Sequence, residues 1–124
     1  MTNKIKILIV EDEAIIAKGL KMDLEELGYL VLNPIAKGED AVPVAIQENP
    51  TLILMDIRLA GGLNGIEAAE RIILKKNIPI AFMTGYATEE IKERAQKINP
   101  LVFLEKPVDI YLLKQIIDTL ITSN

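Results

Sequence analysis

The sequence predicts the α/β class, with a parallel β-sheet covered by helices on both faces. Short apolar runs alternate with amphipathic stretches along the whole chain, which is typical of strands joined by helical crossovers. The first run, residues 5–10, is almost continuously apolar, as expected for a strand buried on both faces. Right-handed crossovers between such strands predict one doubly wound sheet.

The length of the chain limits the number of domains. Its 124 residues are enough for one hydrophobic core and too few for two, so we expect a single domain over residues 1–124. Half of the residues are hydrophobic and 26% are charged, the balance of a globular chain. No apolar run approaches the ~20 residues that span a bilayer. The absence of cysteine is consistent with the cytoplasm, where we expect the protein.

Charge and residue types exclude several function classes. The net charge is −4, no basic stripe is present, and tryptophan is absent, so we expect no direct nucleic-acid partner. Without histidine, the chain can use neither histidine acid–base catalysis nor histidine metal ligation.

The first half of the chain predicts two strand–helix pairs. After the strand over 5–10, a helix is expected over 14–27, with Gly28 as the residue that ends it. Its apolar residues recur at helical spacing: Ile15, Ile16, Leu20, Leu24 and Leu27. A second strand is expected over 29–35, with Pro34 near its end, and a second helix over 39–48. Pro43 is tolerated in that helix if it lies in the first turn.

The second half predicts three further pairs. Strands are expected over 52–55, 78–83 and 101–104, and helices over 66–76, 88–98 and 109–121. A glycine-rich loop over 60–65 precedes the third helix, and Asn64 with Glu67 resembles a capping box at its start. The last helix is expected to face inward with its apolar residues: Leu112, Leu113, Ile116, Ile117 and Leu120.

Polar residues directly follow four of the predicted strands. Glu11 and Asp12 follow the first strand and Asp56 follows the third, while Thr84 and Lys106 follow the fourth and fifth. In a flavodoxin-like sheet of order 2-1-3-4-5, the first, third and fourth strands are neighbours, and ligands bind at their carboxyl ends. We therefore expect the three carboxylates to meet there, flanked by Thr84 and Lys106.

Each of these residues alone also has a purely structural explanation. Acidic residues before a helix complement its dipole by roughly 0.3–1 kcal/mol, and an Asp after a strand is common in turns. Together, however, like charges 4 Å apart repel by ~4 kcal/mol at an effective dielectric of 20, so the cluster needs cations. Lys106 supplies one charge, and oxygen ligands favour Mg²⁺ for the other two. Asp56 would then be a carboxylate nucleophile beside a metal.

These strand-end residues resemble the site of the receiver domain of two-component response regulators. The matching features are Glu11-Asp12 after the first strand, Asp56 after the third, Thr84 before a small residue, and Lys106-Pro107 after the fifth. Thr84 and Lys106 lie 22 residues apart, which fits the family's spacing. The resemblance covers about residues 4 to 122.

The resemblance implies a phosphoryl transfer to Asp56 from a histidine kinase or a histidine phosphotransfer protein. Because this chain has no histidine, the donor must be another protein. The resemblance also implies Mg²⁺, which Mn²⁺ or Ca²⁺ could replace. Its ligands would be Asp12, Asp56 and the backbone carbonyl of Arg58, with Glu11 acting largely through water.

The same resemblance implies a switch. Lys106 would pair with Asp56 and then with a phosphoryl oxygen, and Thr84 would move to hydrogen-bond that group. Phe103 would turn inward and change the surface offered to a downstream protein; a plain core residue is the alternative. Phosphorylation adds roughly −1.5 to −2 charge, which can bias such a two-state surface. The chain is thus expected to be a signalling domain and not an enzyme, as a monomer or weak dimer.

Two features depart from the family pattern. Many receivers have Met-Pro after the phosphoacceptor and a glycine eight residues on, whereas here Gly65 is nine residues after Asp56 and the loop has no proline. This extra residue leaves the path of the loop open. Arg58 and Tyr86 are bulky at positions that tend to tune water access, so we predict a phosphorylated lifetime of minutes or longer.

Two other functions fit the sequence less well. A flavin- or nucleotide-binding enzyme needs a phosphate cradle after the first strand, where residues 11–13 are acidic instead and neither GxGxxG nor a Walker motif occurs. A receiver-like interaction module that no longer takes phosphate would have lost one of the five site residues, and none is missing.

The sequence also leads to an expectation about how the domain occurs, alone or within a longer protein. We expect one receiver domain over 1–124 with no output domain, either as a stand-alone protein or as a fragment of a longer regulator or hybrid kinase. The charged helix over 89–97 is either a partner surface or a solvated face.

Overall fold

Five strands and five helices alternate along residues 5–122, which the computed structural model describes. Their bounds are β1 Lys6–Val10, α1 Ala14–Glu26, β2 Leu30–Val31, α2 Gly38–Glu48, β3 Leu52–Asp56, α3 Gly65–Ile73, β4 Ile80–Thr84, α4 Glu89–Gln96, β5 Val102–Glu105 and α5 Ile110–Thr122. The strands form one parallel sheet of order β2-β1-β3-β4-β5, which confirms the predicted flavodoxin-like topology. Within these residues, no helix is long and apolar enough to cross a membrane.

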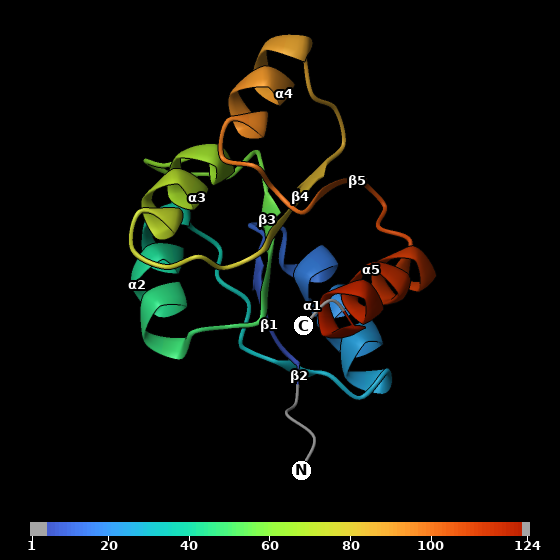
Figure 1. Ribbon diagram of the computed structural model, residues 1–124. Helices are drawn as coiled ribbons and strands as arrows, with labels where there is room; N and C mark the ends of the chain where they lie inside the picture. The colour runs from blue at the N-terminus through green and yellow to red at the C-terminus, as the bar shows by residue number, and fades with distance from the viewer. Residues whose placement is uncertain (1–4, 123–124) are drawn as a thin grey trace.

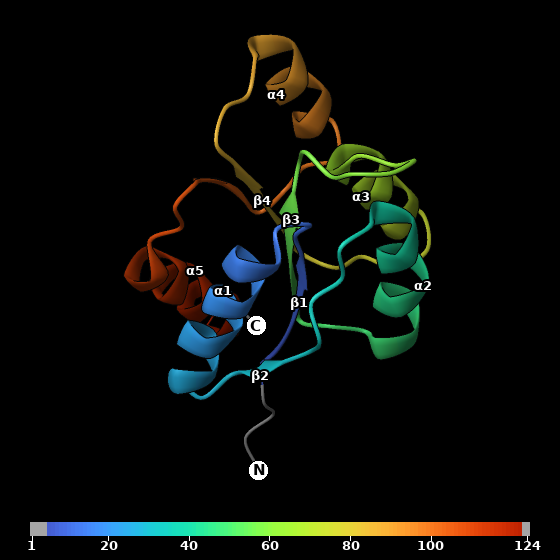
Figure 2. The same ribbon diagram turned by 180° about the vertical axis from the view of Figure 1, so that it is seen from behind.

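Helices cover both faces of the sheet, as Figures 1 and 2 show from opposite sides. α1 and α5 pack on one face, against alternate strand residues such as Ile7, Ile9 and Leu54. α2, α3 and α4 lie over the other face, where Leu8 and Met55 are buried. β1 is buried on both faces of the sheet, which confirms the prediction made from its continuous apolar run. β3 is buried on both faces as well.

The second strand is much shorter than the predicted range of 29–35. The backbone N–H groups of Leu30 and Leu32 donate to Ile5 and Ile7, so the next donor in this parallel register would be residue 34. Pro34 has no N–H, and Ile35 donates to the Ile9 carbonyl instead, at 2.9 Å. The ladder is therefore interrupted after Val31 and returns only as an isolated bridge between Val10 and Ile35.

Three helical predictions need correction. α3 ends at Ile73 rather than residue 76, with Leu74 as its C-cap. Pro43 lies inside α2 beyond the first turn, where it cannot donate to the carbonyl of Glu39. In α5, Leu113 and Ile117 are buried as expected, but Leu112 is 46% exposed and so does not face inward. The capping box of Asn64 and Glu67 is confirmed, with both reciprocal hydrogen bonds present.

Candidate functional site

The candidate site lies at the carboxyl edge of the sheet, where buried strands end in polar residues. Register brings these ends together, since Val10 pairs with Met55, Asp56 with Met83, and Thr84 with Glu105. β1, β3 and β4 are buried along their apolar residues, and a polar residue stands at the carboxyl end of each strand or directly after it. Because the strands are parallel and in register, these polar residues all lie at the same edge of the sheet.

The three predicted acids come together at this edge. Glu11, Asp12 and Asp56 each offer a carboxylate oxygen, and these oxygens lie within 4.8 Å of one another. Glu11 and Asp56 are buried, at 2% and 4% exposure, whereas Asp12 is exposed. Such a set of oxygen donors suits a hard divalent cation such as Mg²⁺.

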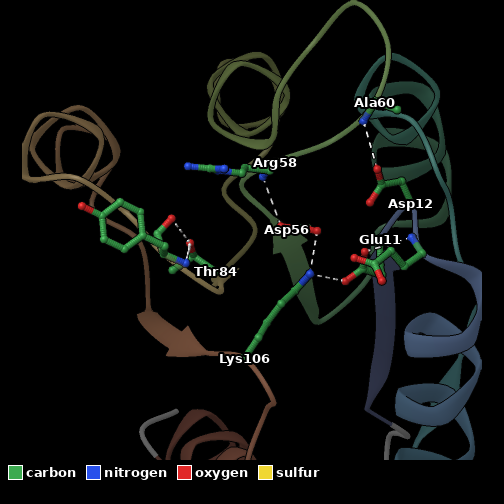
Figure 3. Close-up of polar contacts among 9 residues, drawn as sticks. Glu11, Asp12, Asp56, Arg58, Ala60, Thr84 and Lys106 are labelled. Carbon is green, nitrogen blue, oxygen red and sulfur yellow. Dashed lines mark hydrogen bonds and ion pairs between the residues drawn. The ribbon is translucent and has the colours of Figure 1, made fainter.

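Lys106 reaches into the acid cluster from the residue after β5 (Figure 3). Its Nζ donates a 2.8 Å hydrogen bond to Asp56 Oδ2 and lies 2.6 Å from Glu11 Oε1. Burial alone would lower the pKa of Lys106, but its contacts with Asp56 and Glu11 outweigh burial and raise that pKa. The ammonium is therefore charged at neutral pH and partly neutralises the cluster.

Glu11 is the least satisfied member of the cluster. Its Oε2 accepts a hydrogen bond from the Glu13 N–H at 3.0 Å. Its Oε1 lies within ion-pair distance of Lys106, but among the described residues it accepts no hydrogen bond of proper geometry. Burial raises the pKa of Glu11 despite the attraction of Lys106, and the nearby Asp56 adds to the rise. A buried carboxylate oxygen that is held by an ion pair alone, without a hydrogen bond of proper geometry, fits a site that takes a hydrated cation.

The loop after β3 closes over the site in spite of its extra residue. The Arg58 N–H donates to Asp56 Oδ1 at 3.1 Å, and the Ala60 N–H donates to Asp12 Oδ2 at 3.2 Å. The Gly65 N–H then returns to the carbonyl of Ile57 at 2.9 Å. A Cβ at Gly65 would overlap the Asp56 carbonyl, so glycine is required there.

Thr84 lies in the same cleft but is bonded away from Asp56. Its hydroxyl donates to the Tyr86 carbonyl at 2.8 Å and accepts from the Tyr86 N–H at 3.1 Å (Figure 3). The cleft has a volume of about 370 Å³ and is lined by Asp12, Glu13, Asp56, Arg58, Thr84, Gly85, Tyr86 and Lys106. Phe103 is half-buried on β5 and stacks on Phe82, with ring centroids 5.7 Å apart.

Sequence reasoning missed one contact of the loop. The carboxylate of Glu39, in the first turn of α2, accepts from the N–H groups of Gly62 and Leu63. The available signal was a glycine pair, Gly61-Gly62, in a loop of unusual length. Spacing along the chain does not indicate that α2 lies beside this loop.

Comparison with known proteins identifies the family. The model of the response regulator receiver domain matches residues 7–118. The chain belongs to this family. The structure of a receiver domain from a modulated diguanylate cyclase of Desulfovibrio desulfuricans G20 is similar, with TM-score 0.91 and 39% identity. That similarity covers 98% of this chain and 96% of the other.

Two further relatives have informative descriptions. The receiver domain of the sensor histidine kinase PA1611 from Pseudomonas aeruginosa PAO1 has TM-score 0.85 and 30% identity, over 97% of this chain and 99% of the other. Its structure contains a magnesium ion coordinated in the active site cleft. The transcriptional regulatory protein PdtaR of Mycobacterium tuberculosis is 34% identical over 85% of this receiver domain and 51% of its own length. The chain thus spans about half or less of the first curated relatives that it matches.

Proposed function

We propose that Asp56 accepts a phosphoryl group from a phosphohistidine of a partner protein, a histidine kinase or a histidine phosphotransfer protein. The observation that carries the proposal is the buried Asp56 carboxylate, bonded to Lys106 beside two further acids. Nucleophile, cation and candidate metal ligands thus share one cleft. The family of the chain supports the same chemistry.

The proposed transfer exchanges one bond at phosphorus for another. A carboxylate oxygen of Asp56 attacks phosphorus, the new O–P bond forms, and the N–P bond breaks with its electron pair left on the donor imidazole. Lys106, already 2.8 Å from Asp56, is positioned to follow the transferred charge.

The residues present fit a divalent cation. Asp12 and Asp56 side chains and the Arg58 backbone carbonyl would hold Mg²⁺, with Glu11 acting through water, and Mn²⁺ or Ca²⁺ could use the same oxygens. The bound cation would supply Lewis-acid neutralisation of the phosphoryl charge. Glu11 Oε1 supports this assignment, because it is buried and has an ion pair with Lys106 but no hydrogen bond of proper geometry.

The proposed signal leaves the site through Thr84 and Phe103. A phosphoryl group on Asp56 would offer three acceptor oxygens, and Thr84 can turn toward them by giving up its local bond to the Tyr86 carbonyl. Phe103 can then change its packing on Phe82, which alters the surface of β5 for a downstream protein. A cytoplasmic location and a monomer or weak dimer stay predictions from the sequence.

A groove beside the site is suited to the phosphoryl donor. It has a volume of about 440 Å³ and is lined by Ile15, Ile16, Gly19, Leu20, Asp23, Met83, Lys106, Pro107 and Val108. Ile15 on α1 is 89% exposed, and Lys106 lines both this groove and the phosphoacceptor cleft. An exposed apolar surface that adjoins the nucleophile indicates a protein contact.

Replacing Ile15 tests this docking surface. Ile15→Ser should slow transfer from a protein donor about tenfold, because an interface side chain of this size contributes ~1–2 kcal/mol. Its rate with acetyl phosphate should be unchanged. Leu74→Ser is the control, since Leu74 is 85% exposed at the end of α3 on the other face. Equal slowing of transfer from the protein donor in both variants would contradict docking at α1.

Intact mass after incubation with Mg²⁺ and acetyl phosphate tests the central proposal. Wild type should gain one phosphoryl group that persists for minutes or longer, and Asp56→Asn should gain none. Asp23→Asn, an exposed aspartate on α1, is the control and should be labelled like wild type. No adduct in wild type, even with a cognate kinase, would overturn the proposal in favour of an interaction module.

A further inference from the structure

The glycine-rich loop between β3 and α3 is held by a carboxylate from another element. Glu39 Oε2 accepts from the Gly62 N–H at 3.3 Å, and its Oε1 accepts from the Leu63 N–H at 3.4 Å. The two oxygens of one side chain therefore bind two successive backbone donors. These donors belong to the glycine-rich part of the loop, beside Gly61.

The electrostatics of Glu39 agree with these contacts. Its side chain is open to solvent, yet hydrogen bonds from its own N–H and from Gly62 and Leu63 hold the pKa of Glu39 below its usual range. An acidic residue in the first turn of a helix also has an ordinary explanation, favourable interaction with the helix dipole. That explanation does not account for both oxygens meeting loop donors.

The start of α2 and the loop are also in steric contact. A Cβ at Gly38 would come within 2.8 Å of the Leu63 carbonyl oxygen, so glycine allows the helix to begin against the loop. On the other side, Asp12 accepts from the Ala60 N–H. Residues 60–63 are thus bound from α2 at one end and from the acid cluster at the other.

We propose that Glu39 is a positioning residue for the metal site, which it serves by fixing the β3–α3 loop. The inference rests on the proposed function, because it concerns the Mg²⁺ that Asp12, Asp56 and the Arg58 carbonyl would hold. Arg58 lies between the Asp56 and Ala60 anchors. A loop with two successive glycines has many accessible conformations, and Glu39 reduces them.

Glu39→Gln and Asp40→Asn make a matched pair of variants. Both residues lie in the first turn of α2, both are exposed, and each change removes one charge near the same helix end. Only Glu39→Gln replaces the acceptor of the Gly62 and Leu63 amides. Because both sites are exposed, both variants should fold, which circular dichroism can verify.

Three readouts test the proposal. In Glu39→Gln without metal, hydrogen exchange at the Gly62 and Leu63 amides should be faster than in wild type and Asp40→Asn. The chemical shifts of those amides should follow the low pKa of Glu39 in wild type and Asp40→Asn, and should lose that titration in Glu39→Gln. The Mg²⁺ dissociation constant from calorimetry should rise about 3- to 10-fold, at or below the low end for outer-shell partners of metal sites.

The outcomes separate this inference from the proposed function. If wild type neither binds Mg²⁺ nor takes a phosphoryl group, the proposed function fails whatever Glu39 does. If wild type does both, and Glu39→Gln matches Asp40→Asn within twofold in Mg²⁺ affinity, the positioning role is wrong and the proposed function stands. Unchanged exchange and titration of the loop amides would likewise overturn the role of Glu39.

Discussion

The two sides of the cleft are held in different ways. The acceptor side is defined as Glu11, Asp12, Asp56, Lys106 and the loop over 57–64. Here side chains from several elements bond to one another and to the backbone of the loop. The switch side, defined as Thr84, Phe103 and α4, has mostly local contacts. The described hydrogen bonds of the Thr84 side chain are to the backbone of Tyr86, two residues on, and Ala95 is the single buried residue of α4.

This difference indicates that the two sides of the cleft have different roles. Long-range bonds fix the geometry in which a phosphoryl group would be received, whereas local bonds can be exchanged with little loss of stability. Both views of the fold show α4 standing apart from the other helices (Figures 1 and 2). The comparison can be tested by weakening each side in turn.

Removing Lys106 should have the largest effect, because it leaves two buried carboxylates without their cation. We expect Lys106→Met to lower the free energy of unfolding by about 3 kcal/mol at pH 7 without metal. Urea unfolding followed by circular dichroism measures it. Lys114→Met is the control, since Lys114 forms an exposed pair with Asp118 whose loss should change stability little. Similar losses of stability in the two variants would mean that Lys106 stabilises the acid cluster no more than an exposed ion pair would.

Addition of Mg²⁺ should come next in size. A cation that binds only the folded state stabilises it by about 2.7 kcal/mol at a concentration 100 times its dissociation constant. Asp12→Asn should lose most of this gain, because it removes a predicted ligand. Thr84→Ala should keep it, because Thr84 belongs to the switch side. Urea midpoints with and without Mg²⁺ measure this stabilisation in each variant. If Mg²⁺ stabilised Asp12→Asn as much as wild type, the acceptor side and the switch side would not differ in metal binding.

The sequence predicted the acceptor side better than the switch side, for a physical reason. Parallel strands end at a common edge, so Glu11, Asp56 and Lys106 could be brought together from strand order alone. The contact of Glu39 with the loop depends on how α2 packs beside α3, which no local pattern encodes. The short β2 depends on where Pro34 falls in the ladder.

The switch side was predicted only as a list of residues. Spacing identified Thr84 and Phe103 but gave no information on the direction of the Thr84 hydroxyl, which is set by a turn at Tyr86. Side-chain orientation in a loop follows from local hydrogen bonds rather than from periodicity. The exposure of Leu112 was missed for a similar reason, because the width of the inward face of α5 depends on its packing.

The pH dependence of stability should give an intermediate effect on the acceptor side. The pKa of Glu11 is raised above its ordinary value of 4.5 by burial and by Asp56, so the folded state binds that proton more tightly than the unfolded state. The free energy of unfolding without metal should therefore fall as pH rises from below 4.5 through the raised pKa.

Replacing Glu11 isolates this contribution. Glu11→Gln should be more stable than wild type by about 1 kcal/mol at pH 7, because the cost of burying the Glu11 charge, which exceeds the attraction of Lys106, is then removed. The difference should shrink as pH falls toward 4.5, since Glu11 becomes protonated in both states. Urea unfolding between pH 4 and pH 7 measures it, with Glu13→Gln, an exposed neighbour, as the control. A difference that does not change with pH would contradict a raised pKa of Glu11.

The smallest effect is expected at α4. Arg94 pairs with Glu70 of α3 at 3.2 Å, and both side chains are more than a third exposed, so Arg94→Ala should cost only about 0.2–0.5 kcal/mol. Urea unfolding measures this loss, and Glu70→Ala should give the same value if the pair is its cause. A loss above 1 kcal/mol would mean that α4 is anchored as firmly as the acceptor side. A small loss would instead leave α4 tied to the fold by Ala95 and the half-buried Ile91 and Ile98, so that it can shift while the acid cluster stays in place.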